Sequence, residues 1–334
     1  MRVVPHVFPE YRRIQITSDI NTSYLENAGG VGAGFSCGID LFYTVMEHTD
    51  ESCPPDFKLT HLAFFNVGAH GDFGGDRARD LFQKRIEEVR PCANELRLAL
   101  VTLDSNISEI LDMDFLTTHT YRNVAAVLAL QKLFKTYYYS STYPLRPFEL
   151  NQSDSSHYDA YTLPLLSTGI TKFFTSGENS DRLEKTDIVS SFPLSYKYLN
   201  VCVGPAVSNA QREQEKDALR EDSTSEANCS RCAKCLRTMA TLDVLGKLDF
   251  YDKAFDLNVY QKLRSRYFGL VLGERKRDPF KKIYDAIKQH DFHVPLGAHF
   301  FRYPPAIFPF AKKYCPKLIK AQYKKLRSGP HWWW

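Results

Sequence analysis

The stretch Val31-Gly-Ala-Gly-Phe-Ser-Cys-Gly-Ile-Asp-Leu-Phe-Tyr-Thr-Val-Met46 decides the fold of this chain. Its apolar start predicts a short buried strand, its small residues predict a tight turn, and the apolar spacing near Asp40 predicts the start of a helix. A strand that leads through such a turn into a helix is the repeating unit of parallel sheets.

Similar units follow along the chain. Buried strands are predicted over residues 61–67, 96–103 and 136–140, and helices over residues 76–90 and from Arg122 onward. Alternating strands and helices predict an α/β fold with a doubly wound, mostly parallel, Rossmann-like sheet. Ligands of such sheets sit beyond the carboxyl ends of the strands, so we expect the site there.

The chain is predicted to have four parts. Residues 1–30 form a preface with a short strand near residues 14–17, and residues 31–201 form the core, which is loop-like between 144 and 182. Residues 202–250 form a zinc-binding segment with a mobile polar insertion, and residues 251–334 form a helical C-terminal extension.

The composition is that of a globular protein. Hydrophobic residues make up 43% of the 334 residues, and the formal net charge of +4 is too small to argue for a nucleic-acid or membrane partner. The N-terminus lacks a signal-peptide core, and no run approaches the roughly 18 apolar residues of a membrane span. We therefore expect a cytoplasmic protein without a membrane partner.

Three cysteines crowd into the segment Cys229-Ser-Arg-Cys-Ala-Lys-Cys235. This spacing lets a tight knuckle present three sulfurs to one tetrahedral ion, and Cys202, at the end of a predicted strand, is the natural fourth ligand. A closed set of four thiolates leaves no coordination position for water. The leading interpretation is therefore a structural zinc ion held by Cys202, Cys229, Cys232 and Cys235. An iron–sulfur cluster and unrelated reduced thiols are the alternatives.

The loop Phe35-Ser-Cys-Gly-Ile-Asp-Leu41 can curl so that backbone N–H groups and a helix N-terminus point at one anion. It resembles the S-G-G-x-D-S signature of the PP-loop ATP pyrophosphatases. The 7-cyano-7-deazaguanine synthase branch of that family has the same order of parts: an Arg-Asn helix like that at Arg122, a Lys-Thr-x-Ile-Val segment like that at Lys185, and a lone cysteine before a C-x2-C-x2-C knuckle. The resemblance spans about two thirds of the chain.

The resemblance implies an adenine nucleotide alpha hydrolase-like core that binds ATP and Mg²⁺. Ser36 and the Gly38 backbone would hold pyrophosphate, and Asp40 would hold magnesium. Arg122 and Lys185 would neutralise charge as pyrophosphate leaves. The remaining residues expected in the pocket are Cys37, Leu41, Asn66, His70, Ser140 and Arg182.

Two of these residues depart from the signature, because Cys37 replaces its first glycine and Leu41 its second serine. Cys37 could instead act as a nucleophile at a helix N-terminus. Asp40 could be only a helix N-cap, Lys185 a surface cation and His70 an ordinary loop histidine. Ser140 and Arg182 could serve turns and caps.

The leading functional hypothesis is an ATP-dependent, AMP- and pyrophosphate-forming ligase or amidotransferase-like enzyme that adenylates a carbonyl or carboxylate oxygen. The first alternative is a catalytically degenerate nucleotide-binding scaffold or regulatory partner. The second is a tRNA- or nucleobase-modifying enzyme that uses the basic tail, residues 312–327, to contact RNA. RNA is the less favoured partner, a homodimer stays open, and Trp332-Trp-Trp has no assigned role.

Overall fold

The computed structural model describes residues 15, 17–19, 25–145, 153–202 and 228–302. These residues fall into two compact units, one reaching to Phe192 and the other beginning at Pro193. We predicted a core that ends at residue 201, followed by a separate zinc segment and extension; the described parts of those two segments belong to one unit together with residues 193–202. The predictions for the preface strand, the mobile insertion, the basic tail and the terminal tryptophans lie at least partly outside the described residues.

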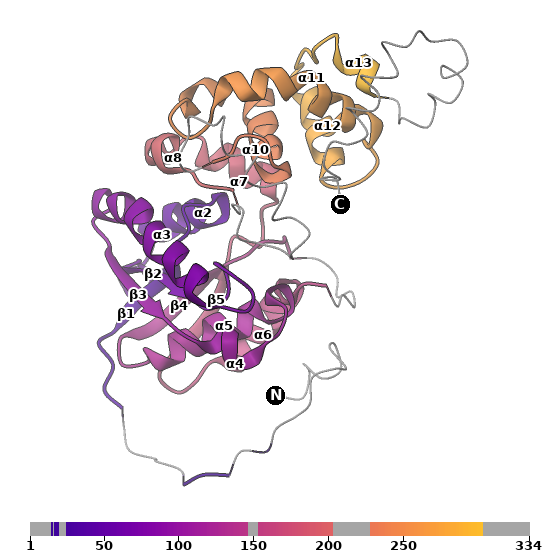
Figure 1. Ribbon diagram of the computed structural model, residues 1–334. Helices are drawn as coiled ribbons and strands as arrows, with labels where there is room; N and C mark the ends of the chain where they lie inside the picture. Colours follow the sequence, from indigo (N-terminus) through magenta and orange to yellow (C-terminus); the bar gives the residue numbers. More distant parts are fainter. Residues whose placement is uncertain (1–14, 16, 20–24, 146–152, 203–227, 303–334) are drawn as a thin grey trace. The chain divides into compact units, whose positions relative to one another are not determined.

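The first unit is built on a five-stranded, all-parallel sheet of strand order β3-β2-β1-β4-β5 (Figure 1). The chain moves outward from β1 to β3 and then returns to the other side of β1, so the switch point lies between β1 and β4. Ligand sites of open parallel sheets lie at such points, beyond the carboxyl ends of the strands. The strands are β1 (Gly30–Gly34), β2 (His61–Asn66), β3 (Ala99–Asp104), β4 (Phe134–Ser140) and β5 (Lys172–Ser176).

Helices cover both faces of this sheet. Phe64 of β2 stacks on Phe82 of α3, with ring centroids 5.5 Å apart, whereas its neighbour Phe65 packs in the cluster that contains Val127 of α5. Alternate side chains of a strand point to opposite faces, so these contacts define two helical layers. The prediction of an α/β fold with a parallel sheet is confirmed, and this arrangement is compatible with a Rossmann-like fold. The helices are α2 (Ile39–Thr49), α3 (Asp76–Glu95), α4 (Ile107–Leu111), α5 (Phe115–Ala129), α6 (Asp159–Leu166) and α7 (Arg182–Val189), with short η1 (Pro55–Phe57) and η2 (Ser155–Tyr158).

Two predicted elements of this unit need correction. Helix α5 begins at Phe115, because the Asp114 side chain accepts a hydrogen bond from the Thr117 N–H and caps it there. Arg122 therefore lies inside the helix and not at its start. The region predicted as loop-like contains η2, α6 and the edge strand β5, whose segment 172–176 pairs with β4.

The described part of the second unit is helical. It contains α8 (Pro193–Tyr198), α10 (Ala233–Val244), η4 (Leu248–Tyr251), α11 (Leu257–Gly273), α12 (Phe280–Gln289) and α13 (Ala298–Phe301). The strand predicted before Cys202 is wrong, because residues 193–198 form α8 and the chain reaches Cys202 without regular structure. Within the described ranges, no helix has the length and apolar character that crossing a bilayer requires.

Candidate functional site

The carboxylate of Asp40 lies between two cations at the carboxyl end of the sheet. Asp40 is in the first turn of α2, Arg182 donates a hydrogen bond to its Oδ2, and Nζ of Lys185 lies 3.6 Å from its Oδ1. Three residues predicted separately from sequence thus meet in one cluster. The N-cap of α2 is Gly38, so the alternative that Asp40 is the N-cap is wrong.

Helix α7 aligns the two cations. Its N-cap Asp181 accepts hydrogen bonds from the N–H groups of Leu183 and Glu184, and the Glu184 side chain accepts one from the Asp181 N–H. This capping box fixes the start of the helix at Arg182. Residues three apart share a helix face, so Arg182 and Lys185 both reach Asp40.

Lys185 is a buried cation and not a surface residue. It is 1% exposed, its ammonium donates to the Ser141 carbonyl at 2.6 Å, and it lies 5.7 Å from the ring centroid of Tyr43. Burial lowers the pKa of Lys185, and the Asp40 carboxylate opposes that shift. Gly177, at φ +82°, leaves room for this side chain, because a Cβ there would lie 3.1 Å from Lys185 Cε.

The predicted phosphate loop lies beside this cluster in the chain. Ser36 is exposed, and Cys37 has φ +56°, a left-handed conformation that glycine adopts at lower cost. Cys37 therefore occupies a backbone conformation that favours glycine. The N-cap residue of the 11-residue helix α2 is Gly38, which has no side chain to accept a hydrogen bond from the N–H groups of the first turn.

The side chains of Cys37 and Leu41 belong to the core. They are 2% and 4% exposed, respectively. Hydrogen bonding to Cys92 and burial raise the pKa of the Cys37 thiol well above its ordinary value. A buried, protonated thiol is a poor nucleophile, which argues against the nucleophile alternative. Leu41 is an apolar core side chain and offers no hydrogen bond to a ligand.

Ser140 ends β4 and joins the strand to α2. Its hydroxyl lies 2.8 Å from that of Thr44, and Thr44 Oγ1 also donates to the Asp40 carbonyl at 3.0 Å. Ser140 thus supports the helix that carries Asp40, in addition to lying at the expected strand end.

The other predicted pocket residues form a second group of contacts around the end of β2. Arg122, 1% exposed, donates to the carbonyls of Asp72 and Met113 at 2.9 and 2.6 Å and to the Ser108 hydroxyl at 3.0 Å. These bonds fix the loops around it, which is a positioning role. The Asn66 amide donates to Asp104 at 2.7 Å.

His70 packs between aromatic rings. It is 8% exposed, with ring centroids 5.2 Å from Phe64 and 5.4 Å from Phe82. Burial lowers the pKa of His70 to about 4, so it is neutral near pH 7. It behaves as a core histidine, which is neither the predicted pocket residue nor the ordinary loop histidine of the alternative.

A hydrogen-bonded chain that the sequence did not suggest lies at the end of β4. Nδ1 of His119 is 2.7 Å from the Tyr139 hydroxyl, and its Nε2 is 2.9 Å from Oδ1 of Asp154. Hydrogen bonds from His119 and Ser156 lower the pKa of Asp154 despite its burial. A carboxylate that orients a histidine against a hydroxyl can relay a proton. The three residues are distant in sequence, and no local motif marks them.

A second carboxyl group, Asp159, lies next to this chain. It is 2% exposed, its Oδ1 accepts from Thr120 at 2.7 Å, and among the described residues its Oδ2 has no hydrogen-bond partner. Burial raises the pKa of Asp159 to about 7, with the charge of His119 opposing the shift. Asp159 can therefore hold a proton near neutral pH.

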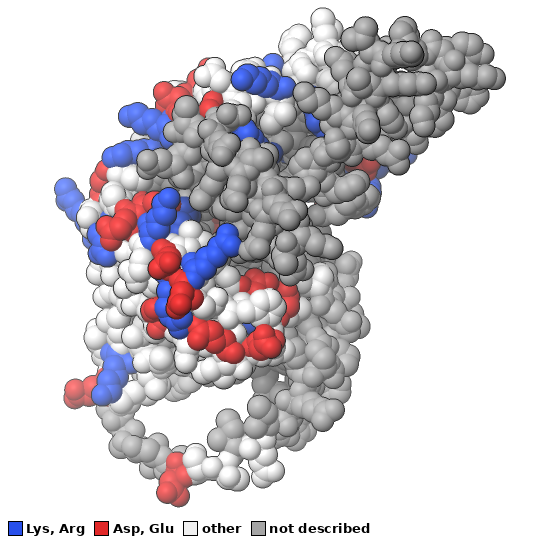
Figure 2. Space-filling view, in the orientation of Figure 1, with Lys and Arg blue, Asp and Glu red and all other residues white. Residues whose placement is uncertain are grey.

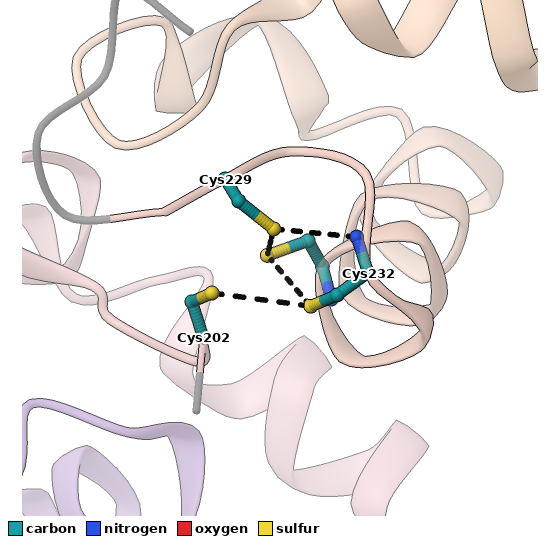
Figure 3. Close-up of side chains that lie close together, drawn as sticks. Cys202, Cys229 and Cys232 are labelled. Carbon is teal, nitrogen blue, oxygen red and sulfur yellow. Dashed lines mark hydrogen bonds between the residues drawn. The ribbon is translucent and has the colours of Figure 1, made fainter. Parts of the chain in front are cut away.

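The four predicted cysteines come together in the second unit, as Figure 3 shows for the three labelled ones. Their sulfurs all lie within 4.8 Å of one another, and three of the separations are 4.0, 3.9 and 3.4 Å. A tetrahedral ion with bonds of about 2.3 Å to sulfur needs sulfurs about 3.8 Å apart. The group can therefore hold a metal ion such as zinc.

Backbone geometry supports this cluster. The N–H groups of Cys232 and Cys235 donate to the sulfurs three residues earlier, at 3.3 and 3.5 Å. Hydrogen bonds from the other three thiols lower the pKa of Cys202. The backbone hydrogen bonds favour thiolate, the form that binds metal, at Cys229 and Cys232, whereas hydrogen bonds from the other thiols raise the pKa of Cys232 and Cys235.

Asn228 holds the two ligand-bearing segments together. Its Oδ1 accepts from the N–H groups of Val201 and Cys202 at 2.9 and 3.1 Å, and its Nδ2 donates to the carbonyls of Leu199 and Ala254 at 2.7 and 2.9 Å. At 1% exposure this amide is buried with its hydrogen bonds made. The position of Cys202 is thus fixed by protein contacts as well as by any metal.

Comparisons with protein-family models, with curated proteins and with solved structures find no match for this chain.

Proposed function

We propose that the first unit binds ATP and magnesium at the Ser36–Asp40 loop and transfers AMP to a carbonyl or carboxylate oxygen, releasing pyrophosphate. The observation that carries this proposal is the meeting of Asp40, Arg182 and Lys185 beside the uncapped N-terminus of α2. A helix N-terminus with two cations beside it favours a polyphosphate. The PP-loop resemblance and the adenine nucleotide alpha hydrolase-like fold belong to the same proposal.

The chemistry follows from charge. A carboxylate is a poor electrophile until one oxygen becomes part of a good leaving group, and attack on the α-phosphorus makes that group AMP. Arg182 and Lys185 stabilise the pyrophosphate that departs, because two fixed cations are already in place when negative charge develops there. Asp40 holds the cations before ATP binds and contacts magnesium afterwards.

The end of β4 is suited to the acceptor. Ser140 contacts α2, whereas its neighbour Tyr139 contacts His119 of α5, so the two cover opposite faces of the same strand end. We assign the Tyr139–His119–Asp154 chain to proton removal from the amine or ammonia that displaces AMP.

The second unit supports the enzyme structurally in this proposal. Cys202, Cys229, Cys232 and Cys235 bind one zinc ion that has no open coordination position. Its contribution is to folding and not to the adenylation chemistry.

Calorimetric titration of the zinc-loaded chain with a non-hydrolysable ATP analogue and magnesium tests the proposal. Lys185→Met should weaken binding at least about tenfold, since a charge-assisted contact contributes about 1.5–3 kcal/mol. Lys172 is an exposed residue of the edge strand β5, so Lys172→Met is the matched control and should bind like the wild type. Asp40→Asn should remove the magnesium dependence.

If the wild-type chain binds no analogue, the loop is that of a degenerate scaffold. Turnover over a substrate panel separates the chemistry further, because this mechanism yields AMP and pyrophosphate, and release of ADP and phosphate alone would contradict it.

A further inference from the structure

The two units carry opposite charge. The described residues of the first unit include 13 lysines and arginines against 23 aspartates and glutamates, a formal charge of −10. Those of the second include 16 against 8, a formal charge of +8. Figure 2 shows acidic side chains over the first unit, with basic side chains among them, on the face that it displays. The small net charge of the whole chain hides this difference, and by overall charge the second unit is the one that favours a long polyanion.

Among the residues that the structure describes, the densest group of cations is the turn between α11 and α12. Arg275, Lys276 and Arg277 follow α11, and Lys281 and Lys282 lie in the first turn of α12. Arg275 donates to the Leu272 carbonyl and Arg277 pairs with Glu274 at 3.5 Å, which fixes the turn. The three lysines are exposed.

Exposed aromatic rings lie next to this turn. A Cβ on Gly269 would lie 2.4 Å from the Phe301 Cβ, and one on Gly273 would lie 2.8 Å from the Arg302 carbonyl oxygen. These glycines let α13 approach the end of α11, directly before the basic turn. Phe300 is 83% exposed and Phe301 47% exposed there.

We propose that this surface, made of Lys276, Lys281, Lys282, Phe300 and Phe301, binds single-stranded nucleic acid. Cations that meet the phosphates and aromatic rings that stack on the bases are the two elements of such sites. An acidic protein would be attracted by the charge alone, whereas the exposed rings favour bases. This proposal does not depend on the ATP site.

Fluorescence anisotropy with a labelled single-stranded RNA of about 20 nucleotides and mixed sequence tests the proposal on the full zinc-loaded chain. Binding should weaken at least about tenfold between about 50 and about 200 mM salt, because phosphate contacts release counterions. Lys276→Glu with Lys281→Glu should bind at least about tenfold more weakly and show a smaller salt slope.

Two controls match these changes. Lys253→Glu with Lys262→Glu alters two exposed lysines of the same unit by the same charge and should bind like the wild type. Phe300→Ser should weaken binding about fivefold or more, as expected for one lost stacking contact. Leu296→Ser, at a position 86% exposed, removes an apolar side chain that cannot stack and should have little effect.

Three outcomes would overturn the proposal. They are no RNA binding at low salt, equal loss in the two double-lysine variants, and binding to phosphatidylserine vesicles without binding to RNA. Thermal unfolding of each variant verifies that it is folded. An equal loss would assign any RNA binding to overall charge, including the basic tail, and not to this surface.

Discussion

The Oδ1 atom of Asp40 lies 3.6 Å from Nζ of Lys185, whose side chain is 1% exposed. A buried ammonium without a counter-charge is costly, so Asp40 stabilises the folded chain in addition to its proposed role in ligand binding. An anion bound at the loop would supply the same compensation. Measurements on an Asp40 variant, with and without an anion, can therefore separate the effect of Asp40 on folding from its proposed effect on ligand binding.

Asp40→Asn should therefore lower the free energy of unfolding by about 3 kcal/mol, because it leaves the buried cation unpaired. Pyrophosphate without metal should raise the melting temperature of this variant more than that of the wild type. Asp187→Asn changes an exposed carboxylate of the same helix, α7, and should alter neither quantity. A variant as stable as the wild type would contradict the compensation.

The left-handed conformation of Cys37 predicts an unusual order of stability for two variants at this position. Cys37→Gly should be more stable than Cys37→Ala by about 1 kcal/mol, because alanine keeps the backbone penalty that glycine removes. Cys92, equally buried but inside helix α3, should show the reverse order, with glycine about 1 kcal/mol worse. Chemical denaturation of the four variants measures both differences. The same order at both positions would show that burial alone controls these sites.

The cysteine cluster should hold one zinc ion per chain. Elemental analysis of the purified protein should find it, and Cys235→Ser should abolish it, since a tetrahedral site loses a quarter of its ligands. Cys92→Ser, outside the cluster, should retain the full content. Chelation should unfold the second unit at a lower temperature. Iron and sulfide in equal amounts would instead establish the cluster alternative.

Asp159 should make stability depend on pH near neutrality. Its folded-state pKa, about 7, lies above the ordinary 3.8, so the folded chain binds the proton more tightly than the unfolded chain. The stabilisation is complete below pH 3.8 and is lost as the pH rises through 7. Asp159→Asn should therefore gain roughly 2–3 kcal/mol relative to the wild type between pH 5 and pH 8.

Urea denaturation at the two pH values measures this change, and Asp80→Asn, an exposed carboxylate of α3, is the control. A constant difference between wild type and Asp159→Asn at both pH values would mean that the Asp159 carboxyl is not shifted.

Sequence reasoning identified the β1–loop–α2 unit because a buried run, small turn residues and a helical pattern occur together there. It missed β5, since residues 172–176 are few and only pairing with β4 makes them a strand. It placed a strand directly before Cys202, where the chain follows the short helix α8 without regular structure. Local propensity is weak in both cases, and tertiary contacts decide the result.

The candidate site was predictable only in part, because some of its residues have a local sequence signature and others are brought together only by the fold. The spacing of Cys229, Cys232 and Cys235 is local and indicates a metal site, and the structure brings Cys202 together with them. Asp40 and Lys185 were suggested by resemblance and Arg182 by its place shortly before Lys185, but their meeting depends on the order in which β1, β4 and β5 pair. His119 and Asp154 have no local sequence signature, so their contact is evident only in the folded structure.

The Asn228 amide and the sulfur cluster fasten both ends of one stretch of chain, at Cys202 and at Cys229. The cost of closing such a stretch grows only with the logarithm of its length, by about 0.6 kcal/mol for each doubling. The chain between these two residues can therefore be lengthened, or a whole domain inserted there, at a loss of only about 0.6 kcal/mol of stability for each doubling of its length.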